Sequence, residues 1–128
     1  MKNLKWLLII TLLASCSRGT KIEVRGTIEN GYGMVFLDMQ GLRGIVPADS
    51  AKLKKNGSFV LSDRIELPTF YNLHLGDQKI IPLLVSPGES VELNINAAAF
   101  VSDYDIQGSP ESLLLKDLYT RIARSNKG

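Results

Sequence analysis

Alternation of apolar and polar residues dominates the middle of this chain and predicts β-strands. In residues 21–29, Ile22, Val24 and Ile28 fall on one side of an extended backbone, and charged residues and threonine fall on the other. Residues 90–96 repeat this alternation with valine, leucine and isoleucine. One face of each such strand is therefore expected to be buried and the other wet, as in antiparallel sheets.

Turn signals separate the apolar segments. Asn30-Gly31 and Ser86-Pro87-Gly88-Glu89 contain residues that tolerate positive φ, and Lys54-Lys55-Asn56-Gly57 predicts a hairpin turn between its flanking strands. Residues 40–47 contain two glycines and a proline and are expected to be irregular. Pro82 predicts an edge strand or a bulge, because proline has no N–H. The expected strands are 21–29, 33–39, 49–53, 58–61, 69–75, 79–85, 90–96 and 104–107.

The pattern changes to a helical period near the C-terminus. Ser109 is expected to be the N-cap and Pro110 the first helical residue, and leucines follow at helical spacing. The predicted fold is therefore mainly β: an antiparallel β-sandwich of about seven or eight strands over residues 21–108, with one C-terminal amphipathic α-helix over residues 109–125. The apolar face of the helix is expected to pack on the sandwich or on a partner. This face is made of Leu114, Leu115, Leu118 and Ile122.

The first fifteen residues have a third pattern, typical of secretion. Lysines flank the start, an apolar run covers residues 6–13, and the small residues Ala14 and Ser15 precede Cys16. The arrangement resembles a bacterial lipoprotein signal with its lipobox. It implies cleavage between Ser15 and Cys16, and a thioether-linked diacylglycerol with fatty acyl chains such as palmitate on the Cys16 thiol. The alternatives are a secreted protein whose signal ends near a cysteine, or a spanning helix, for which the apolar run is too short.

The charge distribution and the cysteine content exclude several classes of function. The chain of 128 residues has 15 basic and 13 acidic side chains. Lys2 and Lys5 leave with the signal, so 13 basic and 13 acidic side chains remain, and they are scattered. No nucleic-acid partner is expected from this distribution. Cys16 is the only cysteine, which excludes an intramolecular disulfide, a cysteine-based metal site and a CxxC pair. Residues 16–20 are expected to be a short tether between lipid and fold.

Few residues are candidates for chemistry. His74 is the only histidine and falls on the expected wet face of its strand, where catalysis or metal binding would need a positioned partner. Asp103 and Asp105 share a strand face and could attract a hard cation, but a solvated strand edge is the default interpretation. Tyr32 and Phe70 are the aromatic residues expected to be exposed. No catalytic residue, metal ligand or cofactor site is predicted.

Four segments of the chain occur in an order found in a known family. They are residues 49–59, Phe70-Tyr71-Asn72-Leu73, residues 81–89 and residues 104–112. Together they resemble the domain of unknown function 4369, over roughly residues 21–125. The resemblance implies a lipid-anchored envelope protein of Bacteroidetes type, in which this domain often precedes a thioredoxin-like thiol-disulfide oxidoreductase domain.

The sequence therefore favours a binding, spacer or presentation module without catalysis. It is expected to be anchored in the cell envelope through lipid on Cys16, at the outer membrane facing the periplasm, with the C-terminal helix meeting an envelope protein. The alternative is the N-terminal fragment of a thiol-disulfide oxidoreductase whose thioredoxin-like catalytic domain is missing from this chain. A third hypothesis, a hydrolase or lectin acting on glycans, requires an exposed aromatic platform or a carboxylate pair in a cleft.

Overall fold

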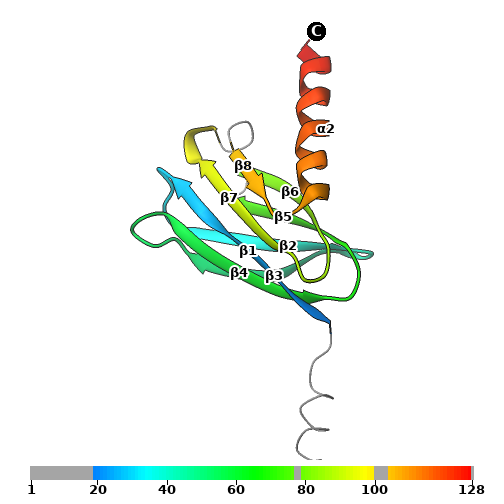
Figure 1. Ribbon diagram of the computed structural model, residues 1–128. Coiled ribbons are helices and arrows are strands. Elements are labelled where there is room, and N and C mark those ends of the chain that lie inside the picture. The colour runs from blue at the N-terminus through cyan, green and yellow to red at the C-terminus, as the bar shows by residue number, and fades with distance from the viewer. Residues whose placement is uncertain (1–18, 77–78, 100–103, 128) are drawn as a thin grey trace, which may run out of the picture.

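The computed structural model of the protein describes residues 19–76, 79–99 and 104–127. It is a two-layer β-sandwich from which one helix projects (Figure 1). This confirms the prediction of a mainly β sandwich of seven or eight strands with a C-terminal helix. The elements are β1 (Thr20–Glu29), β2 (Met34–Gly41), β3 (Gly44–Lys52), β4 (Ser58–Ile65), β5 (Thr69–Leu75), β6 (Lys79–Val85), β7 (Ser90–Asn96), η1 (Ala97–Ala99), β8 (Tyr104–Gln107) and α2 (Pro110–Lys127).

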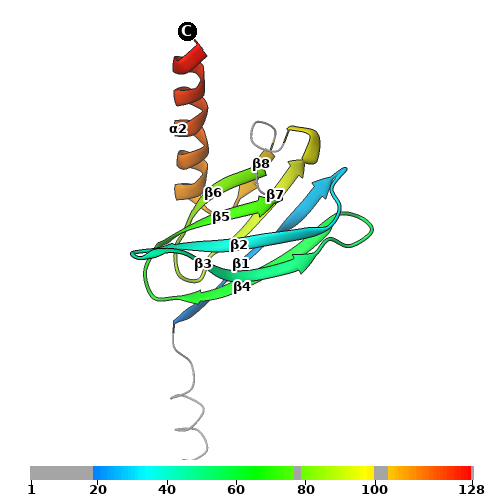
Figure 2. The same cartoon turned by 180° about the vertical axis from the view of Figure 1, so that it is seen from behind.

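Two four-stranded sheets form the layers. One has the strand order β4-β1-β7-β8 and the other the order β3-β2-β5-β6. Neighbouring strands are antiparallel except β1 and β7, which run parallel. A parallel pair needs a long connection, and here the chain traverses the whole second sheet between the two strands. The view from behind shows this second sheet in front (Figure 2).

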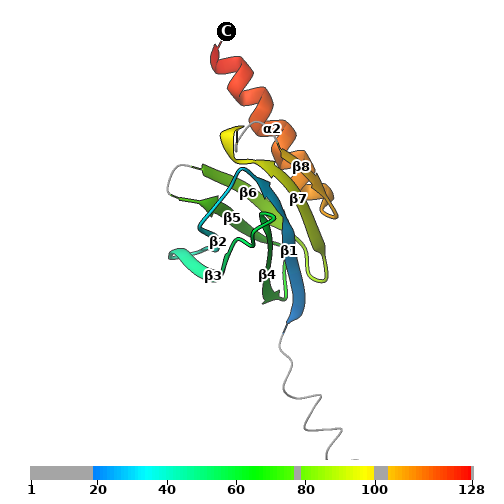
Figure 3. The same ribbon diagram turned by 90° about the vertical axis from the view of Figure 1, so that its left-hand side faces the viewer.

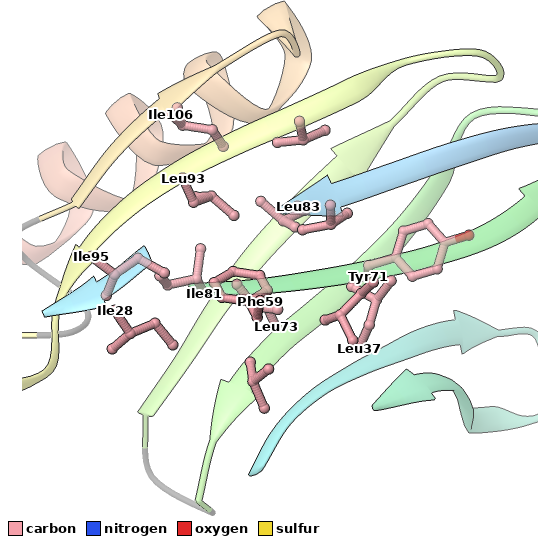
Figure 4. Close-up of a cluster of buried hydrophobic side chains, with 14 of the residues drawn as sticks. Ile28, Leu37, Phe59, Tyr71, Leu73, Ile81, Leu83, Leu93, Ile95 and Ile106 are labelled. Carbon is pink, nitrogen blue, oxygen red and sulfur yellow. The ribbon is translucent and has the colours of Figure 1, made fainter. Parts of the chain in front are cut away.

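The core lies between the sheets and is built from alternate residues of the strands. Ile22, Val24 and Ile28 of β1 are at most 1% exposed, as their alternation predicts. Tyr71 and Leu73 of β5, in the other layer, belong to the same buried cluster (Figure 4). Among the described residues, the buried core cluster begins at residue 22 and ends at residue 106. None of the α2 side chains that the structure describes belongs to this cluster.

The region predicted to be irregular, residues 40–47, is instead the end of one hairpin. β2 continues to Gly41 and β3 begins at Gly44, so that Leu42 and Arg43 form a two-residue turn. A register shift between Leu37 and Asp38 lies just before this turn. The prediction was wrong because glycine and proline are common both in tight turns and in longer irregular loops.

The predicted hairpin around Lys54-Lys55-Asn56-Gly57 is wrong in its pairing. β3 and β4 flank this turn but belong to different sheets, so the chain crosses between layers here. The turn itself forms, with Gly57 at φ 82° and its N–H donating to Lys54 O at 2.8 Å. The two strands are joined across the sandwich edge by Ser62 N–H, which donates to Asp49 Oδ2 at 2.8 Å.

Two other turn and edge predictions are confirmed. Pro82 lies in β6, an edge strand of its sheet, where a missing N–H is tolerated. Gly88 has φ 86°, and Glu89 N–H donates to Ser86 O at 3.1 Å, which closes the turn between β6 and β7. The Glu89 side chain accepts from Ser86 N–H at 2.7 Å and further fixes this turn.

Two tyrosines are held in surroundings that disfavour the phenolate. Tyr71 is 1% exposed and donates its hydroxyl hydrogen to Asp63 Oδ2 at 2.8 Å, from β5 in one sheet to β4 in the other. Burial, followed by the hydrogen bond and charge of Asp63, raises the pKa of Tyr71 far above its usual value of 10. Burial raises the pKa of Tyr104 to about 12.

Alkaline pH is therefore expected to destabilise the fold through these phenols. The pKa values of both tyrosines are higher in the folded than in the unfolded chain. Their contribution to the free energy of unfolding is therefore complete below about pH 10 and is lost as the pH rises above it. Tyr71→Phe should flatten the fall in the free energy of unfolding above about pH 10, measured by urea denaturation at stepped pH. The exposed Tyr119→Phe is the control, and equal pH slopes in wild type and Tyr71→Phe would contradict this assignment.

Candidate functional site

The base of helix α2 is fixed to the free edge of β6. Ser109 and Ser112 are 3% and 1% exposed, and their hydroxyl oxygens lie 2.8 Å apart. Ser112 Oγ accepts from Leu84 N–H at 3.0 Å, and both hydroxyls lie 2.9 Å from Leu84 O. These contacts satisfy backbone groups of an edge strand that no neighbouring strand pairs.

Ser109 also caps the helix, as predicted. Its Oγ accepts from Ser112 N–H at 3.3 Å, and its carbonyl oxygen accepts from Leu113 N–H at 3.1 Å. Pro110 is the first helical residue. Ser112 was not singled out from the sequence, although a second serine three residues after the N-cap was the available signal.

A second contact ties the same end of the helix to the other sheet. Lys116 Nζ donates to Tyr104 O of β8 at 2.5 Å and lies 4.8 Å from the centre of the Tyr104 ring. β6 and β8 are edge strands of different sheets. The first two turns of α2 therefore hold the helix at a defined place where both layers end (Figure 3).

One face of the described helix is exposed from Leu114 onward. Leu114, Leu118 and Ile122 are 70%, 53% and 46% exposed, and only Leu115 of the predicted apolar face is partly buried. Exposed apolar residues at i, i+4 and i+8 form a continuous stripe on a helix. We call Leu114, Leu118 and Ile122 the helix stripe. Such a stripe marks a protein interaction site more often than isolated surface leucines do.

His74 was expected to stand alone, and the structure corrects this. Its Nε2 lies 2.7 Å from Asp38 Oδ2, its Nδ1 lies 3.0 Å from Gly76 O, and its ring stacks on Phe36 with centroids 5.1 Å apart. Both ring nitrogens are therefore within hydrogen-bond distance of an oxygen of the protein. Neither nitrogen is left to accept a substrate proton or ligate a metal, and this arrangement favours a structural role.

Asp38→Ala is expected to lower the free energy of unfolding by about 1–2 kcal/mol, because it leaves the mostly buried His74 ring without its acceptor. The matched control is Asp117→Ala, whose ion pair with Arg121 is exposed and should contribute less than about 0.5 kcal/mol. Thermal denaturation of both variants measures the difference. Equal effects would remove the case for a structural Asp38–His74 pair.

A shallow polar depression of about 520 Å³ lies where β1 and β7 end. Asparagine side chains and two carboxylates, Glu29 and Asp105, line much of it. Asp103, the predicted partner of Asp105, lies outside the described residues. Among the residues that are described, no group of three or more His, Cys, Asp or Glu is placed to hold a metal ion. The asparagines at the depression are Asn30, Asn56, Asn94 and Asn96.

Tyr32 and Phe70 are both exposed, as predicted. Tyr32 lies beside Leu75 at the end of β5, whereas Phe70 lies at the start of that strand. These two rings therefore do not form one platform for a sugar. In the part of the chain that the structure describes, no helix is long and apolar enough to cross a membrane. Ser15 and Cys16, the predicted cleavage and lipidation site, lie outside that part.

These features define a β-sandwich domain with a terminal helix fixed at its base and open along its apolar stripe. The chain belongs to the family described as domain of unknown function (DUF4369), which it matches over residues 22–115. This confirms the family resemblance found in the four sequence segments. The match covers the strands from Ile22 onward and the base of α2. No curated protein and no solved structure matches the chain.

Proposed function

We propose that this protein is a lipid-anchored, non-enzymatic module of the bacterial cell envelope that presents the helix stripe to a protein partner. The observation that carries the proposal is a helix fixed by Ser109, Ser112 and Lys116 whose apolar stripe is left open. A rigid base lowers the conformational entropy lost when a partner binds. The described chain begins on one side of the sandwich, and α2 projects from the other (Figure 1).

The anchor in this proposal is lipid on Cys16. Thr20, where β1 begins, is the fourth residue after Cys16, so an extended chain between the two spans at most about 14 Å. A diacylglycerol with further acylation supplies more than one chain, which stable anchoring requires. The proposed location is the outer membrane, facing the periplasm, with α2 directed away from the bilayer. The lipoprotein-type signal at residues 1–15 supports this location.

The anchor is tested by membrane fractionation of Cys16→Ala. The variant should leave the membrane fraction yet keep the thermal stability of the wild type, since the core begins at residue 22. Ser17→Ala is the control and should stay in the membrane fraction. Unchanged fractionation of Cys16→Ala would contradict lipid anchoring.

The partner is tested with a photo-crosslinking residue at position 118, in the helix stripe. A discrete protein adduct is expected in envelope membranes, because an apolar partner surface would cover Leu118. The control position is Val60, which is equally exposed on β4. No adduct at position 118, or the same adduct at both positions, would contradict a docking role for the stripe.

The helix stripe also supports a second candidate function, the N-terminal part of a thiol-disulfide oxidoreductase. A domain that follows α2 in a longer chain would cover Leu118 and Ile122. An in-frame thioredoxin-like segment with a CxxC pair in the DNA after residue 128 would favour this candidate over a separate partner.

A further inference from the structure

Exposed apolar side chains gather at the end of the sandwich where the described chain begins. Leu42 and Leu67 lie in connections between strands, where polar residues and glycine are usual. Leu42 is fully exposed and Leu67 is 73% exposed. The nearby strand residues Ile45, Val46 and Phe70 are also at least 48% exposed. We call this set the tether-end patch; its members are Leu42, Ile45, Val46, Leu67 and Phe70.

Strand register brings the patch together. Met39 of β2 lies opposite Tyr71 of β5, so continuing the register places Leu42 level with Pro68, next to Leu67. Residues 44–46 of β3 lie opposite residues 39–41 and begin directly after the Leu42 turn. The view from behind shows the β2–β3 turn and the β4–β5 connection at the same end of the sandwich (Figure 2).

The same end carries the point where the chain enters the fold. Thr20 is the first residue of β1 and lies opposite Ile65, the last residue of β4. Leu67 is two residues further along. Figures 1 and 2 both show the start of β1 on the side where the β4–β5 connection lies. A lipid on Cys16, within about 14 Å of Thr20, would hold this end of the domain at the bilayer.

The charges around the patch suit a lipid surface. Arg43 lies in the turn beside Leu42, and Arg64 is exposed on β4. Lys21 on β1 is also exposed, and its Nζ lies 4.0 Å from Glu23 Oε2. Glu66 is the acidic residue next to Leu67. Apolar tips beside arginine and lysine are typical of surfaces that rest in the headgroup region of a membrane with anionic lipids.

We propose that the tether-end patch inserts Leu42 and Leu67 into the lipid interface, so that the domain rests on the membrane in one orientation. This inference rests on the proposed anchoring at Cys16. The contact between these leucines and lipid would then contribute to membrane binding in addition to the acyl chains. In the resulting orientation, α2 and the helix stripe point away from the bilayer.

The test uses the mature chain from residue 16, which contains no tryptophan because Trp6 is the only one. A palmitoyl chain is coupled chemically to the single thiol of Cys16, and the protein is mixed with vesicles of phosphatidylethanolamine and phosphatidylglycerol. Leu42→Trp and Leu67→Trp should each show a blue-shifted emission and protection from iodide when vesicles are added. Leu114→Trp, on the helix stripe, is the control and should show neither change.

Partition into the vesicles gives a second readout. Leu42→Ser combined with Leu67→Ser should weaken partition of the palmitoylated chain about tenfold, because partial burial of two leucines is lost. Leu114→Ser combined with Leu118→Ser should leave partition unchanged. All four positions are exposed, so the fold is expected to survive each change.

Three results would overturn the proposal. The first is an unshifted Leu42→Trp emission on vesicle-bound protein, and the second is an equal shift at position 114. The third is a concentration-dependent shift without vesicles, which would assign the patch to a second copy of the chain. Because the acyl chain is attached chemically, none of these results depends on whether cells lipidate Cys16.

Discussion

Gly26→Ala is expected to lower the free energy of unfolding by more than about 3 kcal/mol and to leave little folded protein at 37 °C. A Cβ atom on Gly26 would lie 1.8 Å from the carbonyl oxygen of Leu93 in the neighbouring strand β7. The obstacle is backbone in the middle of a sheet, so no side-chain rotation relieves it. The fold can accept the methyl group only by separating the parallel strands β1 and β7.

Gly41→Ala is the matched control for this prediction. Gly41 also lies in a strand without positive φ, but the nearest atom to its added Cβ is Gly44 O at 3.3 Å. Its expected effect is below about 1 kcal/mol. Urea denaturation of both variants, in a chain that starts at residue 16, gives the two midpoints. A wild-type midpoint for Gly26→Ala would contradict the register between β1 and β7.

Ser112→Ala is expected to loosen the base of helix α2 and to lower the free energy of unfolding by about 2–3 kcal/mol. The change removes the acceptor of Leu84 N–H and one of the hydroxyls beside Leu84 O, at a position where the Ser112 side chain is buried. Combining it with Ser109→Ala should add about 1 kcal/mol, because the N-cap is then also lost. Hydrogen exchange should show faster exchange at the Leu84 amide and throughout the first turns of α2.

Thr120→Ala tests whether these effects belong to the helix base. The Thr120 hydroxyl bonds only within the exposed part of α2, to Lys116 O at 2.9 Å. This variant should leave both the stability and the Leu84 exchange rate near wild type. Equal loss of protection in Thr120→Ala and Ser112→Ala would mean that the serines do not fix the helix.

Much of the sandwich could be predicted because one face of each strand is buried. The alternation of Ile22, Val24 and Ile28 with polar residues predicts which side of β1 faces the core, and these three side chains are buried. No comparable pattern in the sequence shows in which of the two sheets a strand lies. Lys54-Lys55-Asn56-Gly57 turns the chain equally well within a sheet or between sheets, so β3 and β4 were paired wrongly.

The candidate site was less predictable because its contacts join distant parts of the chain. His74 and Asp38 are 36 residues apart, and Ser112 reaches a backbone group 28 residues away. Neither pair has a spacing that a local pattern reveals. The exposed helix stripe could be predicted as apolar from its period, but its exposure depends on how α2 leaves the sandwich at Lys116.

The tether-end patch could not be predicted from the sequence, because its residues also come together only in the fold. Leu42 falls within residues 40–47, which the sequence marks as irregular, and a leucine there looks like an ordinary loop residue. Only the register of β2 with β5 brings it beside Leu67 and the start of β1. The proposed membrane contact at this end and the proposed partner on the helix stripe are compatible with a single orientation of the domain.

We propose that lipid on Cys16 anchors the protein. The most direct measurement is the intact mass of the protein extracted with detergent from envelope membranes, with sequencing of its N-terminal peptide. We expect a chain that begins at Cys16 and carries the mass of a thioether-linked diacylglycerol. A chain that keeps residues 1–15, or one with an unmodified Cys16 thiol, would contradict it.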